Sequence, residues 1–130
     1  MQGGKSHALF AAAMMTLLAG SAHAAAPAAG NAAHGKQVFQ EQCSLCHTVA
    51  PNAPPGAGPM LKGIVGRKAA ADPKFTYTSA MKKMKVTWTA DNIQKLLTDP
   101  NKMVPGTAMP IALPGAKDRQ DVIAYLTTLK

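Results

Sequence analysis

Apolar side chains recur at helical spacing in the C-terminal part of the chain, and two amphipathic helices are predicted there. The first runs from about Thr89 to Asp99, because Pro100 cannot continue a helix. Its apolar positions, three and four residues apart, are Ile93, Leu96 and Leu97. The second begins near Lys117, and its apolar face consists of Val122, Tyr125, Leu126 and Leu129. Faces of this kind are typical of helices that pack on a core.

A third helix is predicted before these two, from about residue 31 to Gln42. Asn31 is a favourable N-cap, and Val38 and Phe39 would face inward. Gly35 interrupts this helix at a cost of about 1 kcal/mol relative to alanine. Such a glycine indicates either the close approach of another helix or an incidental weak spot, and these residues alone do not decide between the two.

Polar and apolar positions nowhere alternate over a stretch long enough for a convincing strand. Long segments rich in proline and glycine separate the three helical patterns, and a short helical turn after Thr78 is the one weaker addition. We therefore predict an all-α fold with three main helices and long loops.

The N-terminal stretch differs in composition from the rest and predicts export. It starts with a single lysine and continues with apolar or small side chains over residues 8–19. It ends in Ser21-Ala22-His23-Ala24, which has small residues at the two positions that a signal peptidase reads for cleavage after Ala24. The alternative is an uncleaved membrane anchor, but twelve apolar residues span only about 18 Å as a helix, against roughly 30 Å of hydrocarbon. We predict a signal peptide at residues 1–24, a flexible leader at 25–30 and one domain at 31–130.

Composition gives that domain a small core and a basic surface. The whole chain has one Trp, two Tyr and three Phe. Its formal net charge is +8, and loss of Lys5 with the signal peptide leaves +7. A basic face can speed docking onto acidic partners; the alternative is that Lys82, Lys83 and Lys85 only solvate a loop. Nucleic-acid binding is disfavoured, since the charges are scattered, no recognition motif appears, and export would separate the chain from the genome.

The chemistry of the chain is indicated by the C-x-x-C-H motif Cys43-Ser44-Leu45-Cys46-His47. One helical turn with this spacing brings two thiols to the two vinyl groups of one porphyrin, while the histidine reaches the iron. The motif predicts one haem c, attached covalently through Cys43 and Cys46. A haem would also add apolar surface to the small core, so we expect the haem-free mature chain to be largely unfolded.

Two other uses of the cysteine pair fit less well. A zinc site needs four ligands, and it would have to take two from His7, His23, His34 and His47, the first two of which leave with the signal peptide. A thioredoxin-like dithiol needs a βαβ setting, and no β-branched strand runs surround residues 38–50. Haem attachment is therefore the favoured interpretation.

A haem iron bound by one histidine needs a sixth ligand or keeps an open position. The methionines outside the signal region are Met60, Met81, Met84, Met103 and Met109. Each of them, taken singly, is more typical of a core than of a ligand. Met109 differs in its setting, because Pro105 and Pro110 stiffen the loop around it. A stiff loop can hold a weak thioether ligand in place.

Further short motifs follow the haem motif in order along the chain. The series consists of GKQVF at residues 35–39, CSLCHTV at 43–49, GPMLKGIVGRK at 58–68, FTYT at 75–78, TW at 87–88, DP at 99–100, PGTAM at 105–109 and VIAYL at 122–126. With this series the chain resembles the class I c-type cytochromes, near the mitochondrial and α-proteobacterial cytochrome c type. The resemblance covers nearly the whole expected mature chain and is far more specific than C-x-x-C-H alone.

The resemblance implies the cytochrome c fold, with three main helices and loops wrapped around one covalently attached haem. The two axial iron ligands would be His47 and Met109, with the ring of His47 oriented by the carbonyl of Pro59. The terminal helices would cross at Gly35, against Tyr125. The residues implied to hold or screen the haem propionates are Arg67, Tyr77, Thr78 and Trp88.

Several positions depart from the mitochondrial pattern. Leu96 stands where that branch has a tyrosine near the methionine sulfur, and Met81 where it has a buried asparagine. Without these polar groups a hydrogen-bond network next to the haem is lost, so the midpoint potential of the family is not carried over. Lysines common around the exposed haem edge are replaced at Gln42, Asn101 and Ala108.

Closed coordination by histidine and methionine implies electron transfer, because it leaves no iron position for oxygen or peroxide. The chain is expected to be a soluble, monomeric, single-haem electron carrier in the periplasm, with no catalytic turnover and at most peripheral membrane contact. Its expected partners are redox proteins such as a quinol:cytochrome c oxidoreductase, a terminal oxidase or a periplasmic dehydrogenase. The alternative is a haem peroxidase, or a haem subunit of a specialised dehydrogenase or sulfur-oxidising complex, with Met109 off the iron.

Overall fold

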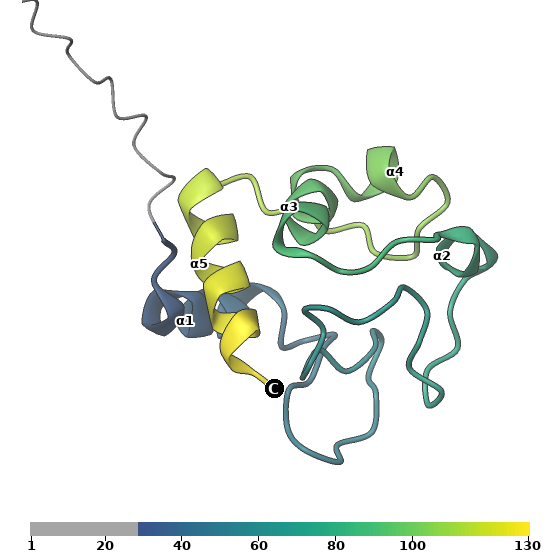
Figure 1. Cartoon of the computed structure of the whole chain (residues 1–130), viewed down its shortest axis with the longest axis horizontal. Helices are drawn as coiled ribbons and strands as arrows, with labels where there is room; N and C mark the ends of the chain where they lie inside the picture. The colour runs from purple at the N-terminus through teal and green to yellow at the C-terminus, as the bar shows by residue number, and fades with distance from the viewer. Residues whose placement is uncertain (1–28) are drawn as a thin grey trace, which may run out of the picture.

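The computed structural model describes residues 29–130, so the predicted signal peptide and most of the predicted leader lie outside the described residues. Its helices are α1 (Ala32–Gln42), α2 (Ser79–Lys83), α3 (Ala90–Thr98), α4 (Pro100–Met103) and α5 (Ala116–Thr128) (Figure 1). The predicted all-α class is confirmed, since residues 29–130 form helices and no strand. The one β-type contact in this part of the chain is an isolated bridge between Lys68 and Thr87. None of the helices in this part of the chain is long and apolar enough to cross a membrane.

The three main helices begin close to the predicted positions, and side chains cap the first turns of α1 and α3. The side-chain oxygen of Asn31 accepts hydrogen bonds from the backbone N–H groups of Ala33 and His34, at 3.0 and 3.1 Å, at the start of α1. The hydroxyl of Thr89 accepts one from the N–H of Asn92, at 3.2 Å, at the start of α3. The last helix, α5, begins one residue before the predicted position.

Two short helices complete the set. The hydroxyl of Thr78 caps α2 by accepting a hydrogen bond from the N–H of Met81 at 3.2 Å, so the predicted turn after Thr78 is confirmed. The helix α4 was not predicted. The carboxylate of Asp99 accepts from the N–H of Lys102 at 3.0 Å, and Pro100 occupies the first position of the new helix, where no N–H is needed. The proline that ends α3 therefore also starts α4.

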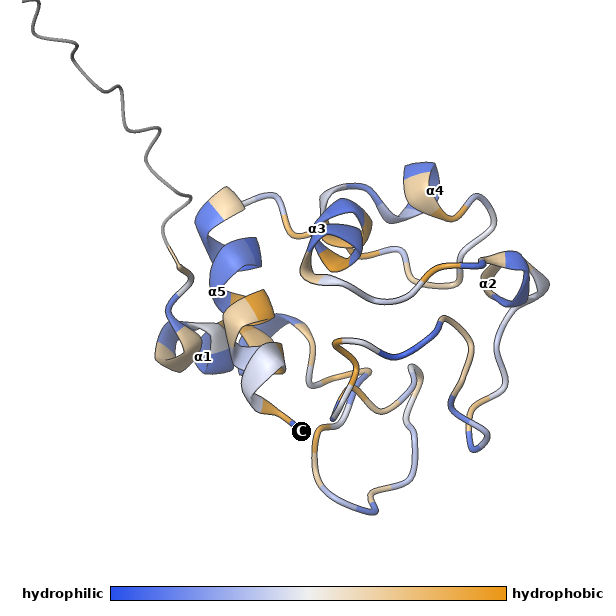
Figure 2. Ribbon diagram, in the orientation of Figure 1, coloured by the Kyte–Doolittle hydropathy of each residue, from blue (hydrophilic) through white to orange (hydrophobic). Residues whose placement is uncertain are grey.

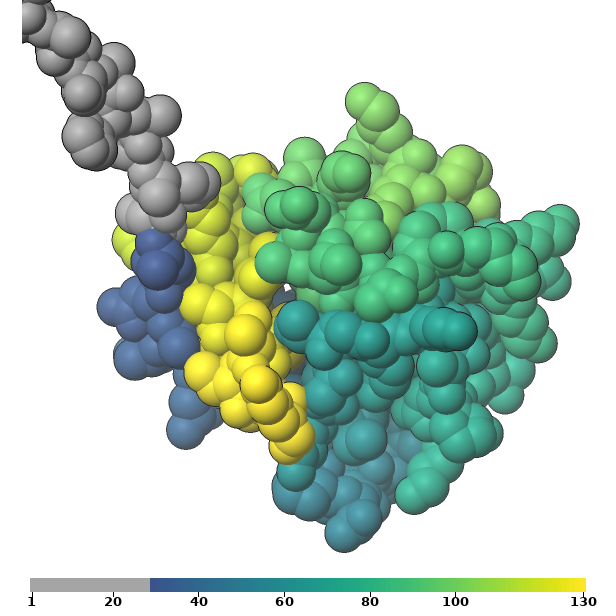
Figure 3. Space-filling model, in the orientation of Figure 1, coloured from purple at the N-terminus to yellow at the C-terminus, as the bar shows by residue number. Residues whose placement is uncertain are grey.

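The terminal helices α1 and α5 cross at one end of the molecule, and α2, α3 and α4 lie on the other side (Figure 1). In the space-filling view the blue N-terminal and yellow C-terminal segments lie directly against each other (Figure 3). A Cβ at Gly35 would overlap the backbone carbonyl of Asp121 in α5, and the rings of Phe39 and Tyr125 pack with centroids 5.7 Å apart. Close approach of another helix is therefore the reason for the mid-helix glycine.

The packed domain begins slightly before residue 31. A Cβ at Gly30 would overlap the backbone carbonyl of Gln120, so this last residue of the predicted leader packs against α5. On the other side of the core, α3 contributes Ile93 and Leu97 as buried side chains. Figure 2 shows blue and orange positions on different sides of this helix, as the apolar spacing of its sequence requires.

One buried carboxylate, which the sequence did not single out, ties α1 to α5. The side chain of Asp121 accepts a hydrogen bond from the N–H of Asn31 at 2.7 Å and one from Nδ1 of His34 at 2.7 Å, and it pairs with Nζ of Lys117. Only 1 % of the residue is exposed. The hydrogen bond from Lys117, followed by that from Asn31, lowers the pKa of Asp121 to about 2.

This carboxylate makes stability depend on acid pH. The pKa of this carboxyl is about 2 in the folded protein and near 4 in the unfolded chain. Its ionised form therefore stabilises the fold fully above about pH 4, and this contribution to the free energy of unfolding is lost as the pH falls toward 2. We expect Asp121→Asn to lower the melting temperature at pH 7, and the gap to wild type to narrow as pH falls from about 4 to 2. Thermal unfolding followed by circular dichroism at several pH values measures this gap, and a gap independent of pH would contradict the assignment.

Candidate functional site

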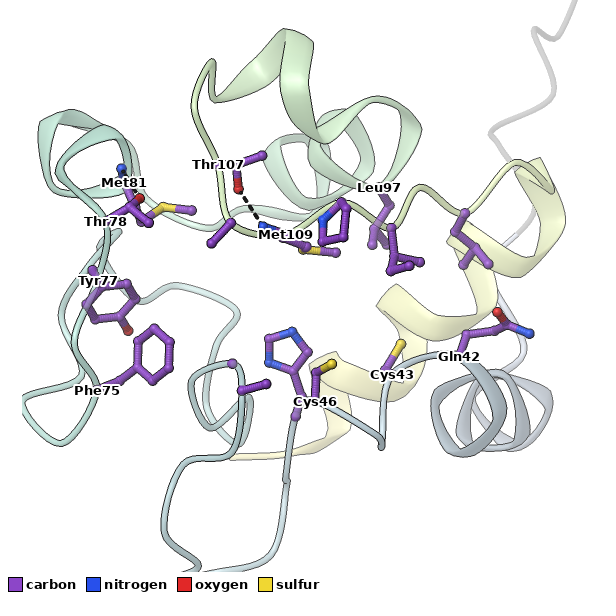
Figure 4. Close-up of a pocket in the computed structure, with 17 residues that line it drawn as sticks. Gln42, Cys43, Cys46, Phe75, Tyr77, Thr78, Met81, Leu97, Thr107 and Met109 are labelled. Carbon is purple, nitrogen blue, oxygen red and sulfur yellow. Dashed lines mark hydrogen bonds between the residues drawn. The ribbon is translucent and has the colours of Figure 1, made fainter.

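A crevice opens into the core between the turn that follows α1 and the loop that follows α4 (Figure 4). It has an outer and an inner part, and the residues that line both are Cys43, His47, Tyr77, Met81, Leu97 and Met109. Most of the remaining lining residues are aliphatic or aromatic. No lysine, arginine, aspartate or glutamate of the described chain lines it. Such walls suit a large apolar group.

The two cysteines reach the crevice because α1 continues into a tight turn. The backbone N–H groups of Cys46 and His47 both donate to the carbonyl of Cys43, at 3.1 and 2.9 Å. Both thiols are free, and Figure 4 shows both sulfur atoms on the same side of the crevice. Burial, with a smaller effect of Cys46, raises the pKa of the Cys43 thiol to about 11. That thiol is therefore protonated at neutral pH in the chain without its cofactor.

The described residues also contain no group of three or more histidine, cysteine, aspartate or glutamate side chains that could hold a metal ion. A structural zinc site would need four such ligands. The cysteine pair therefore lacks the further ligands of this kind that a structural zinc site needs among residues 29–130.

The ring of His47 is held in one orientation by its neighbours. Its Nδ1 lies 2.8 Å from the carbonyl oxygen of Pro59, which can only accept, so Nδ1 carries the proton and Nε2 keeps a free lone pair. Burial lowers the pKa of His47, although the hydrogen bond to Pro59 acts in the opposite direction. A Cβ at Gly58 would overlap the ring and lie 2.6 Å from Nδ1. The result is a neutral imidazole in the form that binds metals.

Met109 enters the crevice from the side opposite to Cys43 and Cys46 (Figure 4). The hydroxyl of Thr107 accepts a hydrogen bond from the N–H of Met109 at 3.1 Å, and the N–H of Thr107 donates to the carbonyl of Val104 at 2.9 Å. Val104 is 1 % exposed and anchors the loop in the core. These contacts fix the loop, as the two prolines predict.

The four residues implied to hold the propionates divide into two groups. Tyr77, Thr78 and Trp88 line the crevice. The hydroxyl oxygen of Tyr77 accepts a hydrogen bond from the N–H of Asp72 at 3.3 Å, which leaves its own proton free to donate. Burial is the main cause that raises the pKa of Tyr77, so the hydroxyl remains protonated at neutral pH.

Arg67 lies outside the lining of the crevice. Its two terminal nitrogens donate to the carbonyls of Met60 and Lys62, at 2.6 and 3.3 Å. Its Nε is buried and has no hydrogen-bond partner among the described residues. An unsatisfied buried donor is costly, and an acceptor on a bound group would relieve it.

Sequence reasoning missed one residue that shapes the site. Gly58 leaves room for the ring of His47, and the signal for it was its position just before Pro59, within a motif assigned to the resemblance. Met81 and Leu96, two of the positions that depart from the mitochondrial pattern, both line the crevice. Two positions where that branch carries polar groups are therefore apolar in the wall itself.

The family model for cytochrome c matches residues 32–130. The chain belongs to the cytochrome c family. Cytochrome c2 of Rhodomicrobium vannielii is 46 % identical over 106 residues, which cover 81 % of this chain and 84 % of that protein. Cytochrome c of Tetrahymena pyriformis is 43 % identical over 77 % of this chain and 90 % of its own, and cytochrome c2 of Blastochloris viridis is 40 % identical over 82 % and 84 %.

As a cytochrome c, the chain binds haem c covalently through Cys43 and Cys46 and transfers electrons. The residues present fit that group. The walls of the crevice are uncharged, and both thiols face into it. A neutral imidazole and a thioether are available in the crevice.

Proposed function

We propose that His47 and Met109 are the two axial ligands of the haem iron, so that this cytochrome c is a pure electron carrier. The observation that carries the proposal is the pair of fixed side chains in one uncharged crevice. His47 presents a free Nε2 lone pair, and Met109 enters from the side opposite to the cysteines. Histidine and methionine are the ligand pair that raises the potential of c-type haems.

When bound, the haem iron supplies a reversible one-electron couple. The carbonyl of Pro59 and the lack of a side chain at Gly58 hold the imidazole of His47 in place. Thr107 and the buried Val104 hold the loop that carries Met109. Because backbone contacts already position both side chains, neither has to move when the oxidation state changes.

The proposal extends to Pro59, Arg67, Tyr77, Thr78 and Trp88 as the remaining haem-binding residues. The hydroxyl proton of Tyr77 and the Nε of Arg67 are donors without an acceptor among the described residues, which supports a role beside carboxylates. Trp88 is 6 % exposed and contributes mainly apolar wall.

We also propose that the carrier works in the periplasm after cleavage following Ala24. Its partners would then be a quinol:cytochrome c oxidoreductase, a terminal oxidase or a periplasmic dehydrogenase, met by a monomer with at most peripheral membrane contact. The signal-like residues 1–24 support export. Two bacterial relatives that carry the name cytochrome c2 support a bacterial electron carrier.

Electron transfer and peroxidase activity can be separated in solution. We expect the native holoprotein, reduced with ascorbate, to be oxidised by a terminal cytochrome oxidase, and to give no sustained peroxide-dependent oxidation of guaiacol. The reason is that Met109 and His47 close both iron positions. Met109→Ala serves as the control and should gain peroxide turnover. Sustained turnover by the folded native protein would favour the enzyme alternative.

A further inference from the structure

A second buried carboxylate, besides Asp121, lies beside the wall of the crevice. Asp72 is 9 % exposed, and these two are the buried acidic residues in the part of the chain that the structure describes. The ion pairs found among residues 29–130 both involve Asp121, so Asp72 has no ion-pair partner there. Buried carboxylates are normally paired, because burial without a partner disfavours the charged form. Asp72 is therefore a buried charge that no cation of the described chain neutralises by direct contact.

Asp72 is held in place by the turn that it starts. Its carboxylate accepts a hydrogen bond from the N–H of Lys74 at 2.9 Å, and its backbone carbonyl accepts one from the N–H of Phe75 at 3.3 Å. Aspartate and asparagine both suit a turn of this kind, since either side chain offers an accepting oxygen. The turn alone therefore does not require a charged side chain.

The same turn leads into two aromatic residues of the crevice wall. Phe75 and Tyr77 pack edge to face, with ring centroids 4.9 Å apart, and lie together at one end of the crevice (Figure 4). The backbone N–H of Asp72 donates to the hydroxyl oxygen of Tyr77 at 3.3 Å. Asp72 is thus one hydrogen bond away from a side chain that lines the crevice.

The charged groups near Asp72 lie behind this end of the wall. Arg67, Asp72 and the exposed Lys74 line one hollow, and none of the residues around that hollow lines the crevice. Burial is the main cause that raises the pKa of Tyr77. Of the two side-chain charges that act on this hydroxyl, Arg67 lowers its pKa and Asp72 raises it. The charge of Asp72 therefore acts on a group inside the crevice.

We propose that the carboxylate of Asp72 lowers the midpoint potential of the bound haem. Oxidation adds one positive charge to the haem, and the uncharged walls of the crevice disfavour that charge. A carboxylate behind the wall stabilises the oxidised form, since charges interact more strongly across a protein interior than across water. Asp72 acts through space and is no iron ligand. The inference rests on haem attachment and holds whichever residue is the sixth ligand.

Redox titration of the holoprotein tests the proposal with an exchange that keeps the turn. Asp72→Asn retains an accepting oxygen for the N–H of Lys74 and removes the charge. It should raise the midpoint potential by about 30 mV or more, which is about a threefold change in the equilibrium constant for one electron. The matched control is Asp91→Asn, which removes the same charge at an exposed position in α3. It should change that constant by less than about 1.3-fold.

Ionic strength and a variant that keeps the charge complete the test. In about 0.5 M salt the shift caused by Asp72→Asn should persist, because a buried charge is screened much less than an exposed one. Asp72→Glu should stay within about 1.5-fold of wild type, since it moves the charge only slightly. Unchanged absorption spectra establish that each variant keeps its haem site. No shift in Asp72→Asn, a shift that salt abolishes, or an equal shift in Asp72→Glu would overturn the proposal.

Discussion

Without its haem, the mature protein will show no cooperative thermal unfolding and little helical circular dichroism. The reason is that most of the hydrophobic core lines the crevice that the haem fills. Of the eleven apolar residues that are buried within residues 29–130, eight also line the crevice, namely Phe39, Ile64, Trp88, Ile93, Leu97, Leu113, Val122 and Leu126. Burial of one such side chain contributes about 1.5–3 kcal/mol. A domain is stable by only about 5–15 kcal/mol in total, so unpacking one face of eight core residues removes the net stability.

Two haem-free forms keep this test independent of the cysteines. One is the wild-type chain produced without haem attachment, and the other is Cys43→Ala/Cys46→Ala. Both should lack a cooperative transition in a thermal scan, while the holoprotein unfolds sharply. A sigmoidal transition in either haem-free form would contradict the idea that the cofactor completes the core.

Replacement of Gly35 by alanine will destabilise the holoprotein, although helix propensity alone predicts that alanine stabilises a helix. Alanine would favour an isolated helix by about 1 kcal/mol. In the fold, however, the added Cβ would overlap the backbone carbonyl of Asp121, and backbone cannot give way as the end of a flexible side chain can. We expect a loss of at least about 3 kcal/mol in the free energy of unfolding, at the upper end of overpacking effects, since α1 and α5 must separate.

The matched control for this variant is Lys36→Ala, the exposed neighbour in the same helix. It should change stability by less than about 0.5 kcal/mol. Denaturation with guanidinium chloride, followed by circular dichroism, measures both variants. A Gly35→Ala protein as stable as the control would show that the helices cross less closely than described.

The main helices were predictable because their signals are local. Caps such as Asn31 and Thr89, and the breaker Pro100, act on neighbouring backbone groups, so their effect can be read from the sequence. The short helix α4 was missed because Pro100 was taken only as a stop, although an aspartate followed by proline is also a typical helix start. The same residue serves both helices.

The parts that could not be predicted depend on contacts between distant segments. The sequence alone left the role of Gly35 open, since the carbonyl that excludes a side chain there belongs to Asp121. Asp121 itself was not singled out, because a charged residue is normally exposed and its partners Asn31 and His34 are far away in the chain. Arg67 was expected in the crevice, and only the structure shows its nitrogens turned to backbone carbonyls.

For the iron ligands, the residues alone gave a histidine and five candidate methionines. The stiff loop around Met109 favoured that residue and the resemblance selected it, while the structure brings two of the five, Met81 and Met109, into the same crevice. Sequence spacing could not separate them, because both belong to segments that meet only in the folded chain. A direct assignment of the sixth iron ligand therefore decides between Met81 and Met109.

The most direct measurement is the near-red absorption band of the oxidised holoprotein, which accompanies a bond between iron and methionine sulfur. We predict that the native protein shows this band, that Met109→Ala loses it, and that Met81→Ala, which alters the other methionine of the crevice, keeps it. A native spectrum without the band, or a band that survives in Met109→Ala, would contradict the proposed ligand pair and with it the closed, electron-carrying site.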